Sequence, residues 1–225
     1  MAVVSQVTSP VQARSDAAWE RSAQALRRAA LAVAQLGSPD LFVDLVQQLA
    51  DDLSAAVAFV AVFENPERSE MRTLAARMDG KLLRNFSYLL AGTPCARVVG
   101  HAFLYIASGG IREFPPGSMF GAKGMDSYAA YPVTASDGTP LGLIAVMDRT
   151  AIADPDLAES LMKIFAVRIA AELERQRALE ALRDSEASYR AIFEAVEDAV
   201  FVHDWDTGAV LDLNSKACEA YGYPR

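Results

Sequence analysis

The sequence predicts an α+β fold, with helices at both ends of the chain and an antiparallel sheet between them. In residues 17–53 and 157–196, apolar side chains recur every three or four positions, which is the spacing of one helix face. In residues 56–148, the apolar residues instead form short runs bounded by turn residues, as strands do. Two pairs of these runs are joined by tight turns, so we expect hairpins and antiparallel pairing.

Two helices are expected before the sheet, after a disordered tail at residues 1–15. The first covers residues 17–36, and the members of its apolar stripe are Trp19, Ala23, Leu26, Ala30 and Val33. Gly37 ends this helix. Ser38-Pro39-Asp40 then supplies an N-cap, a first-turn proline and an acidic residue for a second helix, which runs to about Leu53.

The first hairpin of the sheet is expected from residues 56–63 and 71–78, with a turn at 65–68. The state of residues 82–90 stays open. A second hairpin is expected from residues 127–134 and 141–148. Asp137-Gly138 lies between its strands, and this pair adopts positive φ at little cost.

The segment between the two hairpins is expected to be irregular. Thr93-Pro94 begins a short helix that Gly100 ends, and residues 103–106 are a strand candidate. A further short helix is expected at residues 117–123.

A long helix is expected from Leu157 to about Val196, capped by Asp154. Eleven of its positions follow a spacing of three and four residues: 161, 164, 168, 171, 175, 178, 182, 185, 189, 192 and 196. Eight of these eleven positions hold apolar residues. This pattern predicts a coiled-coil seam, although Arg168, Arg175 and Ser185 weaken it. The alternative is a single helix that packs on its own domain.

The last residues predict a strand at 199–203, a turn at 206–208, a strand at 210–213 and a helix from Asn214. About 30 residues are too few for an independent hydrophobic core. We therefore do not expect this segment to fold as a domain by itself.

Composition narrows the class of protein. The chain has 225 residues, 52% of them hydrophobic and 22% charged, with a net charge of −8. Such a chain is globular, and it lacks the clustered Lys and Arg that nucleic-acid phosphates require. The two cysteines are far apart, which indicates a reducing compartment, and no apolar run is long enough to insert into a membrane. We expect a cytoplasmic location.

Three stretches of the chain resemble GAF domains. They are LAGTPCARVVG at 90–100, DSYAAYPVTASDGTPLGLIAVMD at 126–148 and IFAVRIAAELERQRA at 164–178. The central stretch carries the strongest motifs, Tyr-x-x-x-Pro-Val followed by Asp-Gly-x-Pro-Leu-Gly. The resemblance implies a GAF-like domain at residues 16–178, with an antiparallel sheet flanked by helices.

The end of the chain is similar to the opening of a PAS domain. Ser185-Glu186, Tyr189-Arg190 and Ile192-Phe193-Glu194 match its entry helix. Residues 214–222, which begin with Asn214, contain Ala217-Cys218 and end with Gly222, match the run that follows its first strands. The resemblance implies a signalling helix at residues 179–197 and a truncated PAS domain at 198–225. The order GAF, helix, PAS is common in bacterial sensor histidine kinases and in cyclic-di-GMP enzymes.

The GAF resemblance also implies a ligand pocket between the sheet and the segment that crosses it. The candidate pocket residues are apolar, aromatic or thiol side chains from these elements: Phe86, Tyr88, Cys95, Val98, Val99, Tyr105, Phe114, Phe120, Tyr128, Tyr131 and Met147. Tyr88, Tyr105 and Tyr131 matter most, since a buried hydroxyl needs a partner that a ligand can supply. The alternative is that these side chains only fill the core.

Cys95 is the one candidate for covalent chemistry, because it lies near the start of a short helix. Some GAF domains attach a bilin through such a cysteine, but there a histidine usually follows, whereas Ala96 follows here. A redox role is the second alternative. We expect no bilin, haem or metal, and the cofactor is unknown. No Asn-Lys and Phe-x-x-x-Asp-Glu pattern of cyclic-nucleotide-binding GAF domains is found.

The expected function is that of a sensory or regulatory module of a bacterial signalling protein, with no catalytic residues of its own. A sensor histidine kinase of a two-component system is the expected host. A diguanylate cyclase or phosphodiesterase is the alternative host, and a ligand-free dimerisation spacer is the alternative role. A methionine sulfoxide reductase would need several nearby cysteines, and the GAF-like domain has only Cys95. We expect a parallel homodimer through residues 17–36 and 157–196, with a small-molecule ligand.

Overall fold

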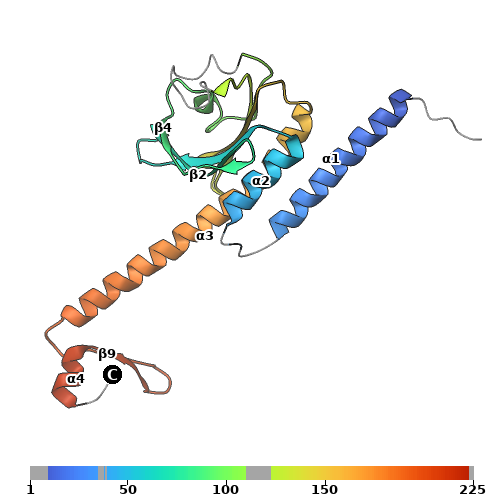
Figure 1. Cartoon of the computed structure of the whole chain (residues 1–225). Helices are drawn as coiled ribbons and strands as arrows, with labels where there is room; N and C mark the ends of the chain where they lie inside the picture. The colour runs from blue at the N-terminus through green and yellow to red at the C-terminus, as the bar shows by residue number, and fades with distance from the viewer. Residues whose placement is uncertain (1–9, 35–37, 39, 110–122, 223–225) are drawn as a thin grey trace, which may run out of the picture. The chain divides into compact units, whose positions relative to one another are not determined.

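The computed structural model describes residues 10–34, 38, 40–109 and 123–222. These residues form two compact units, Met1–Glu172 and Leu173–Arg225, each taken by itself below. The first unit holds a mixed set of helices and strands, and the second holds a two-stranded sheet and a short helix (Figure 1). The predicted α+β fold is confirmed.

The first unit is built on a seven-stranded antiparallel sheet in the order β3-β2-β1-β7-β6-β5, with β4 also paired to β2. Its strands are β1 (Val57–Phe63), β2 (Glu70–Met78), β3 (Lys81–Leu82), β4 (Ser87–Leu89), β5 (Leu104–Ile106), β6 (Ser127–Thr134) and β7 (Pro140–Asp148). The two predicted hairpins are β1–β2 and β6–β7, and β1 pairs with β7 at the centre. Residues 82–90, whose state was open, supply the last residue of β3 and the whole of β4, both of which pair with β2.

Two helices precede the sheet. α1 spans Pro10–Ala34, so residues 10–15 of the expected tail are helical, and residues 1–9 and the 117–122 part of the expected short helix lie outside the described residues. α2 spans Leu41–Leu53 and contacts β1, β2 and α1 (Figure 1). The buried residues of α1 include Ala25 and Ala29, whereas Trp19 is 75% exposed. The apolar stripe predicted for α1 is therefore not on the helix face that packs against the rest of the first unit.

The two faces of the sheet bury different partners. Alternate residues of β1, namely Val57, Phe59 and Ala61, belong to an apolar cluster with Cys95, Val98 and Tyr128. Ala58 and Val60 are equally buried but point to the other face. α2 contacts this strand and its neighbour β2, and buries Leu45 and Leu49.

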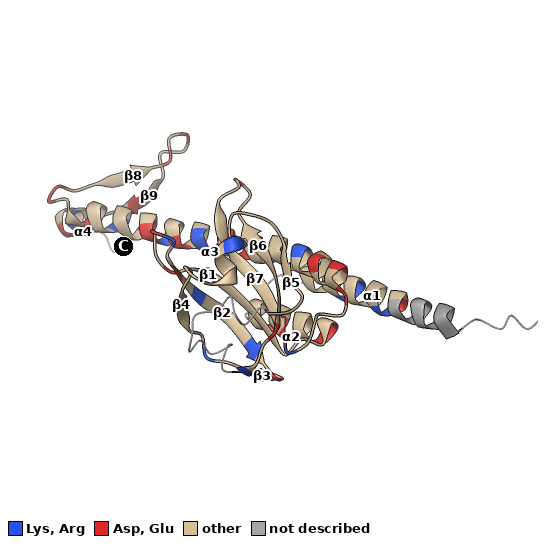
Figure 2. Cartoon of the chain, turned by 90° about the horizontal axis from the view of Figure 1, so that it is seen from above, with Lys and Arg blue, Asp and Glu red and all other residues tan. Residues whose placement is uncertain are grey.

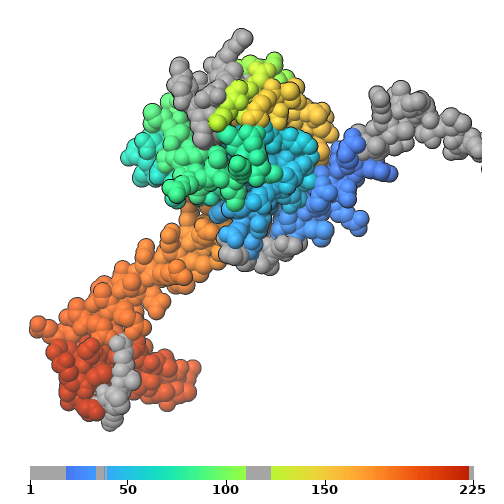
Figure 3. Space-filling model, in the orientation of Figure 1, coloured from blue at the N-terminus to red at the C-terminus, as the bar shows by residue number. Residues whose placement is uncertain are grey.

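α3 runs without a break from Pro155 to Ala195, as the sequence predicted. The side chain of Asp154 caps it, since Oδ1 accepts a hydrogen bond from the amide of Leu157 at 2.9 Å. Its early residues, such as Leu161 and Phe165, are fully buried, whereas residues 175–192 are all exposed. Figure 3 shows this stretch as an uncovered orange segment, and Figure 2 shows charges of both signs along it.

The second unit contains the end of α3, β8 (Phe201–His203), β9 (Val210–Leu213) and α4 (Ser215–Tyr221). β8 and β9 form an antiparallel pair, joined by a turn that the carboxylate of Asp204 supports through bonds to Asp206 and Thr207. Trp205 is 98% exposed in this turn. None of the described helices combines the length and apolar character needed to cross a bilayer.

Candidate functional site

The candidate site is a sulfur–phenol cluster inside the first unit. Its centre is Cys95, whose Sγ accepts hydrogen bonds from the hydroxyls of Tyr128 at 3.3 Å and Tyr88 at 3.5 Å. Cys95 and Tyr128 are completely buried. The cluster therefore places one thiol and two phenols in an otherwise apolar core.

Three separate elements bring these side chains together. Tyr88 lies on β4, opposite Met71 of β2, and Tyr128 lies on β6, opposite Met147 of β7. Cys95 lies on the 3-10 helix η1, Pro94–Arg97, which covers the sheet between them. The turn before η1 is fixed by Thr93, whose hydroxyl donates to the carbonyl of Leu90 at 2.7 Å.

β4 is itself anchored by a side chain. The hydroxyl of Thr73 on β2 accepts a hydrogen bond from the amide of Phe86 at 2.9 Å, and the Thr73 amide donates to the Phe86 carbonyl at 3.0 Å. The rings of Phe86 and Tyr88 lie 6.2 Å apart at 43°. This anchoring holds the Tyr88 hydroxyl over the thiol.

Burial dominates the electrostatics of the cluster. It raises the pKa of the Cys95 thiol above its ordinary value, although the hydrogen bonds from Tyr128 and Tyr88 oppose this shift. Burial, and then the neighbouring Cys95, holds the pKa of Tyr88 and of Tyr128 well above the usual range. All three groups are therefore protonated at neutral pH, and Cys95 is a poor nucleophile there.

The structure brings together seven of the eleven candidate pocket residues. Within the apolar cluster lie Phe86, Tyr88, Cys95, Val98, Val99, Tyr128 and Met147. Phe114 and Phe120 lie outside the described residues.

Two candidates lie on the other face of the sheet, which corrects their assignment to the same pocket wall. Leu104 and Ile106 face the cluster, so Tyr105 between them points away, and its hydroxyl donates to the carbonyl of Ile152 at 3.2 Å. Tyr131 follows Ala130, which faces the cluster, and it also points away.

Several members of the cluster are not among the residues predicted from the sequence. Met71 and Met125 are buried there, as are Phe59 and Leu143 on the two central strands. Strand alternation could have found Phe59 and Leu143, once β1 and β7 were known to be neighbours. Nothing local marks Met125, which lies two residues before β6.

The cluster offers hydroxyl donors and soft thioether and thiol surfaces, but no ionised group. Among the described residues, no three His, Cys, Asp or Glu side chains lie close enough together to hold a metal ion.

The fold of the first unit is that of GAF domains. The GAF domain of A. aeolicus nlh2, solved in an inactive state, is 12% identical to this chain, with a TM-score of 0.52. The alignment covers 69% of this chain and 97% of that domain. The GAF domain of the phosphoenolpyruvate-protein phosphotransferase (ptsP) from Coxiella burnetii is 16% identical, with a TM-score of 0.59 over 72% of this chain and 98% of that one.

A third similar structure is the GAF domain of an Acinetobacter phosphoenolpyruvate-protein phosphotransferase, 16% identical, with a TM-score of 0.55 over 69% of this chain and 93% of that one. Identities this low show the fold alone. Residues 187–225 match the family model of the PAS domain. No curated protein sequence matches the chain.

Proposed function

We propose that this chain, which joins a GAF fold to a segment matching the PAS domain, is the input part of a sensor histidine kinase in a two-component system. GAF and PAS domains are sensory and regulatory modules of signalling proteins. The observation that carries the proposal is α3, because one unbroken helix begins in the GAF-fold unit and continues into the PAS match at residue 187. A helix shared in this way is a direct mechanical link.

The host protein is open to a direct test. The coding sequence that follows Arg225 should encode a helix with a phosphoacceptor histidine and then an ATP-binding domain. A GGDEF or phosphodiesterase signature there would instead support the alternative host, a cyclic-di-GMP enzyme. A stop codon would refute the histidine kinase.

The proposed signal is a small molecule bound without a covalent bond beside Tyr88, Cys95 and Tyr128. Support comes from the two hydroxyls, which are the polar groups that such a ligand would engage. A thermal-shift screen of uncharged metabolites tests this, because a ligand that binds only the folded state raises the melting temperature. The shift should disappear in Tyr88→Phe and persist in Tyr105→Phe, whose hydroxyl faces Ile152.

A ligand-free spacer is the second candidate role. It is favoured by the fact that both hydroxyls already have a partner within the chain, the sulfur of Cys95. A ligand must therefore bind strongly enough to compensate for the loss of these two hydrogen bonds to the sulfur. A screen in which no compound shifts the melting temperature would support the spacer.

We further propose a parallel homodimer through the open faces of α1 and α3. On α3, the seam positions Leu182, Tyr189 and Ile192 are exposed in the single chain. Arg168, which the heptad pattern placed on the same seam, is buried beside Glu172 at 3.7 Å, so the upstream part of the pattern belongs to the first unit. On α1, Trp19 is open to a partner.

The proposed mechanism is a relay from the GAF unit along α3. A ligand at the cluster changes the packing of α3 only if it binds two packings with different affinity. In this proposal the segment itself has no enzymatic activity and acts in the cytoplasm, and its output is carried by a later domain.

A further inference from the structure

The side chain of Asn214 ends one helix and begins another. It is completely buried, and its Nδ2 donates to the carbonyls of Phe193 at 3.2 Å, Val196 at 3.3 Å and Asp198 at 3.0 Å. The last four carbonyls of a helix lack partners within it, and α3 ends at Ala195. Asn214 therefore satisfies one of these carbonyls, that of Phe193, from a position 21 residues later in the chain, and its bonds to Val196 and Asp198 hold the residues that follow the helix.

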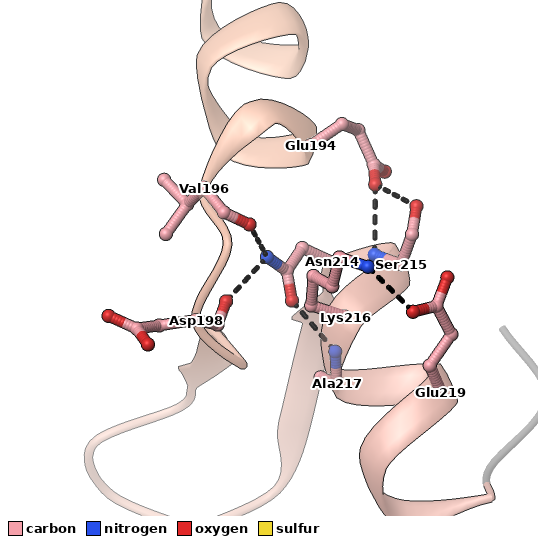
Figure 4. Close-up of polar contacts among 8 residues, drawn as sticks. All are labelled: Glu194, Val196, Asp198, Asn214, Ser215, Lys216, Ala217 and Glu219. Carbon is pink, nitrogen blue, oxygen red and sulfur yellow. Dashed lines mark hydrogen bonds and ion pairs between the residues drawn. The ribbon is translucent and has the colours of Figure 1, made fainter.

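The other half of the same amide serves different segments. Its Oδ1 accepts hydrogen bonds from the amides of Ala217 and Val200, both at 3.0 Å, so Asn214 is the N-cap of α4 and also fixes the approach to β8. The backbone amide of Asn214 donates to the carbonyl of Val200 at 3.1 Å. One side chain thus joins the end of α3, the link to β8 and the start of α4. Figure 4 shows its bonds to Val196, Asp198 and Ala217.

Glu194 makes a second bond between the same two helices. Its Oε2 accepts from the amide of Ser215 at 2.9 Å and also from the Ser215 hydroxyl. Figure 4 shows Glu194 reaching from the last turn of α3 to the first residue of α4. The neighbouring pair Lys216–Glu219, at 2.8 Å, lies within α4 and does not reach α3.

We propose that Asn214 is a coupling residue, which makes the last turn of α3 and the start of α4 form and open as one unit. A displacement of α3 then moves α4 and the β8–β9 pair instead of being absorbed by fraying of the helix end. The proposal deepens the relay suggested above by naming where α3 delivers its movement. It concerns residues 193–217 alone and requires no ligand.

Hydrogen exchange of backbone amides in the full chain tests the coupling. Ala191→Gly, at an exposed position of α3, should loosen the helix end and speed exchange there about fivefold. If the helices open together, the amides of α4 should speed up by a similar factor. Asn214→Ser keeps an N-cap for α4. It removes the donor bond to Phe193 in the last turn of α3 and the two donor bonds to Val196 and Asp198 just after it. In this background Ala191→Gly should therefore affect α3 alone.

Two results would overturn the proposal. One is an α4 that does not respond to Ala191→Gly in the otherwise unchanged chain. The other is a response of α4 that is the same whether or not the chain also carries Asn214→Ser, because the coupling would then have another origin. Lys216→Ala is the matched surface control, and it should leave the response of the α4 amides to Ala191→Gly unchanged.

A second variant covers the case in which Asn214→Ser unfolds the second unit. Glu194→Ala removes the other bonds to α4 while Asn214 stays in place, and the amides of α4 should still respond to Ala191→Gly in this background. If Ala191→Gly speeds exchange of the α4 amides as much in Glu194→Ala as in the otherwise unchanged chain, Asn214 is the coupling residue. If the α4 amides no longer respond, the coupling belongs to Glu194 and the proposal is refuted. These exchange experiments involve no ligand, so a ligand screen that finds nothing would not affect their interpretation.

Discussion

The hydroxyl of Tyr128 lies 3.3 Å from the sulfur of Cys95, although 33 positions separate the two residues in the chain. The bond links β6 to the 3-10 helix that covers the sheet. Tyr88, from the far edge of the sheet, donates to the same sulfur. One thiol thus ties the covering segment to two strands.

Cys95 should react slowly with thiol reagents in the folded protein. Its side chain is buried, and burial raises its pKa, so little thiolate is present or accessible. With Ellman's reagent at pH 8, Cys218→Ser, which retains Cys95, should react at least about tenfold more slowly than Cys95→Ser, which retains the half-buried Cys218. Both should react at similar rates in denaturant. Equal native rates would show that Cys95 is accessible.

The cluster should destabilise the protein at alkaline pH. The pKa values of Tyr88, Tyr128 and Cys95 are raised on folding, so above the unfolded pKa values the unfolded chain binds fewer protons than the folded one. The stabilisation is complete below these unfolded values, of about 8.5 for Cys and about 10 for Tyr, and is lost as pH rises toward the folded values. Urea titrations from pH 8 to 11 should show that the free energy of unfolding falls as pH rises. This fall should be smaller in Tyr128→Phe. An unchanged slope in that variant would contradict the assignment.

Tyr128→Phe should cost about 1 kcal/mol at neutral pH, since it keeps the ring and removes one hydrogen bond. Tyr128→Ala should cost about 3–5 kcal/mol, because it also leaves a cavity in a fully buried site. Chemical denaturation of both variants measures these losses. If the phenylalanine variant lost as much as the alanine variant, the bond rather than the packing would dominate.

Gly142→Ala should disrupt the centre of the sheet. An added Cβ would lie 2.1 Å from the carbonyl oxygen of Ala61 on β1, and strand backbone cannot easily move. We expect a loss of at least about 3 kcal/mol, measured by urea unfolding. Gly208→Ala is the control, because its φ of +70° brings strain but no close contact, and it should cost about 1–2 kcal/mol. Equal losses would argue against the clash.

Leu182→Glu should break the proposed homodimer. Leu182 is 64% exposed and lies on the apolar side of α3, so a partner would bury it. Light scattering should give a dimer mass for the unchanged chain and at least about tenfold weaker association for the variant, because a buried carboxylate would have no partner. Ala187→Glu adds the same charge on the opposite side of the helix and should remain dimeric. A monomer at every concentration of the unchanged chain would refute the dimer.

Local patterns predicted the elements well where they depend on neighbouring residues. The Asp137-Gly138 turn, the cap at Asp154 and the two hairpins follow from turn chemistry, capping and alternation, all of which act over a few positions. Seven of the residues proposed from the resemblance to a known fold lie together in the apolar cluster. The error at Tyr105 and Tyr131 arose because aromatic character was considered without strand parity, which decides the face.

The sequence by itself determined the order of helices and strands, the length of α3 and the α+β class, because apolar periodicity and turn residues are local properties. Only the tertiary structure decided which residues share a site. Cys95 meets Tyr88 and Tyr128 through the pairing of β4 with β2 and of β6 with β7, and Asn214 reaches the end of α3 through the β8–β9 turn. These contacts depend on register between distant strands, and no pattern within a single segment encodes that register.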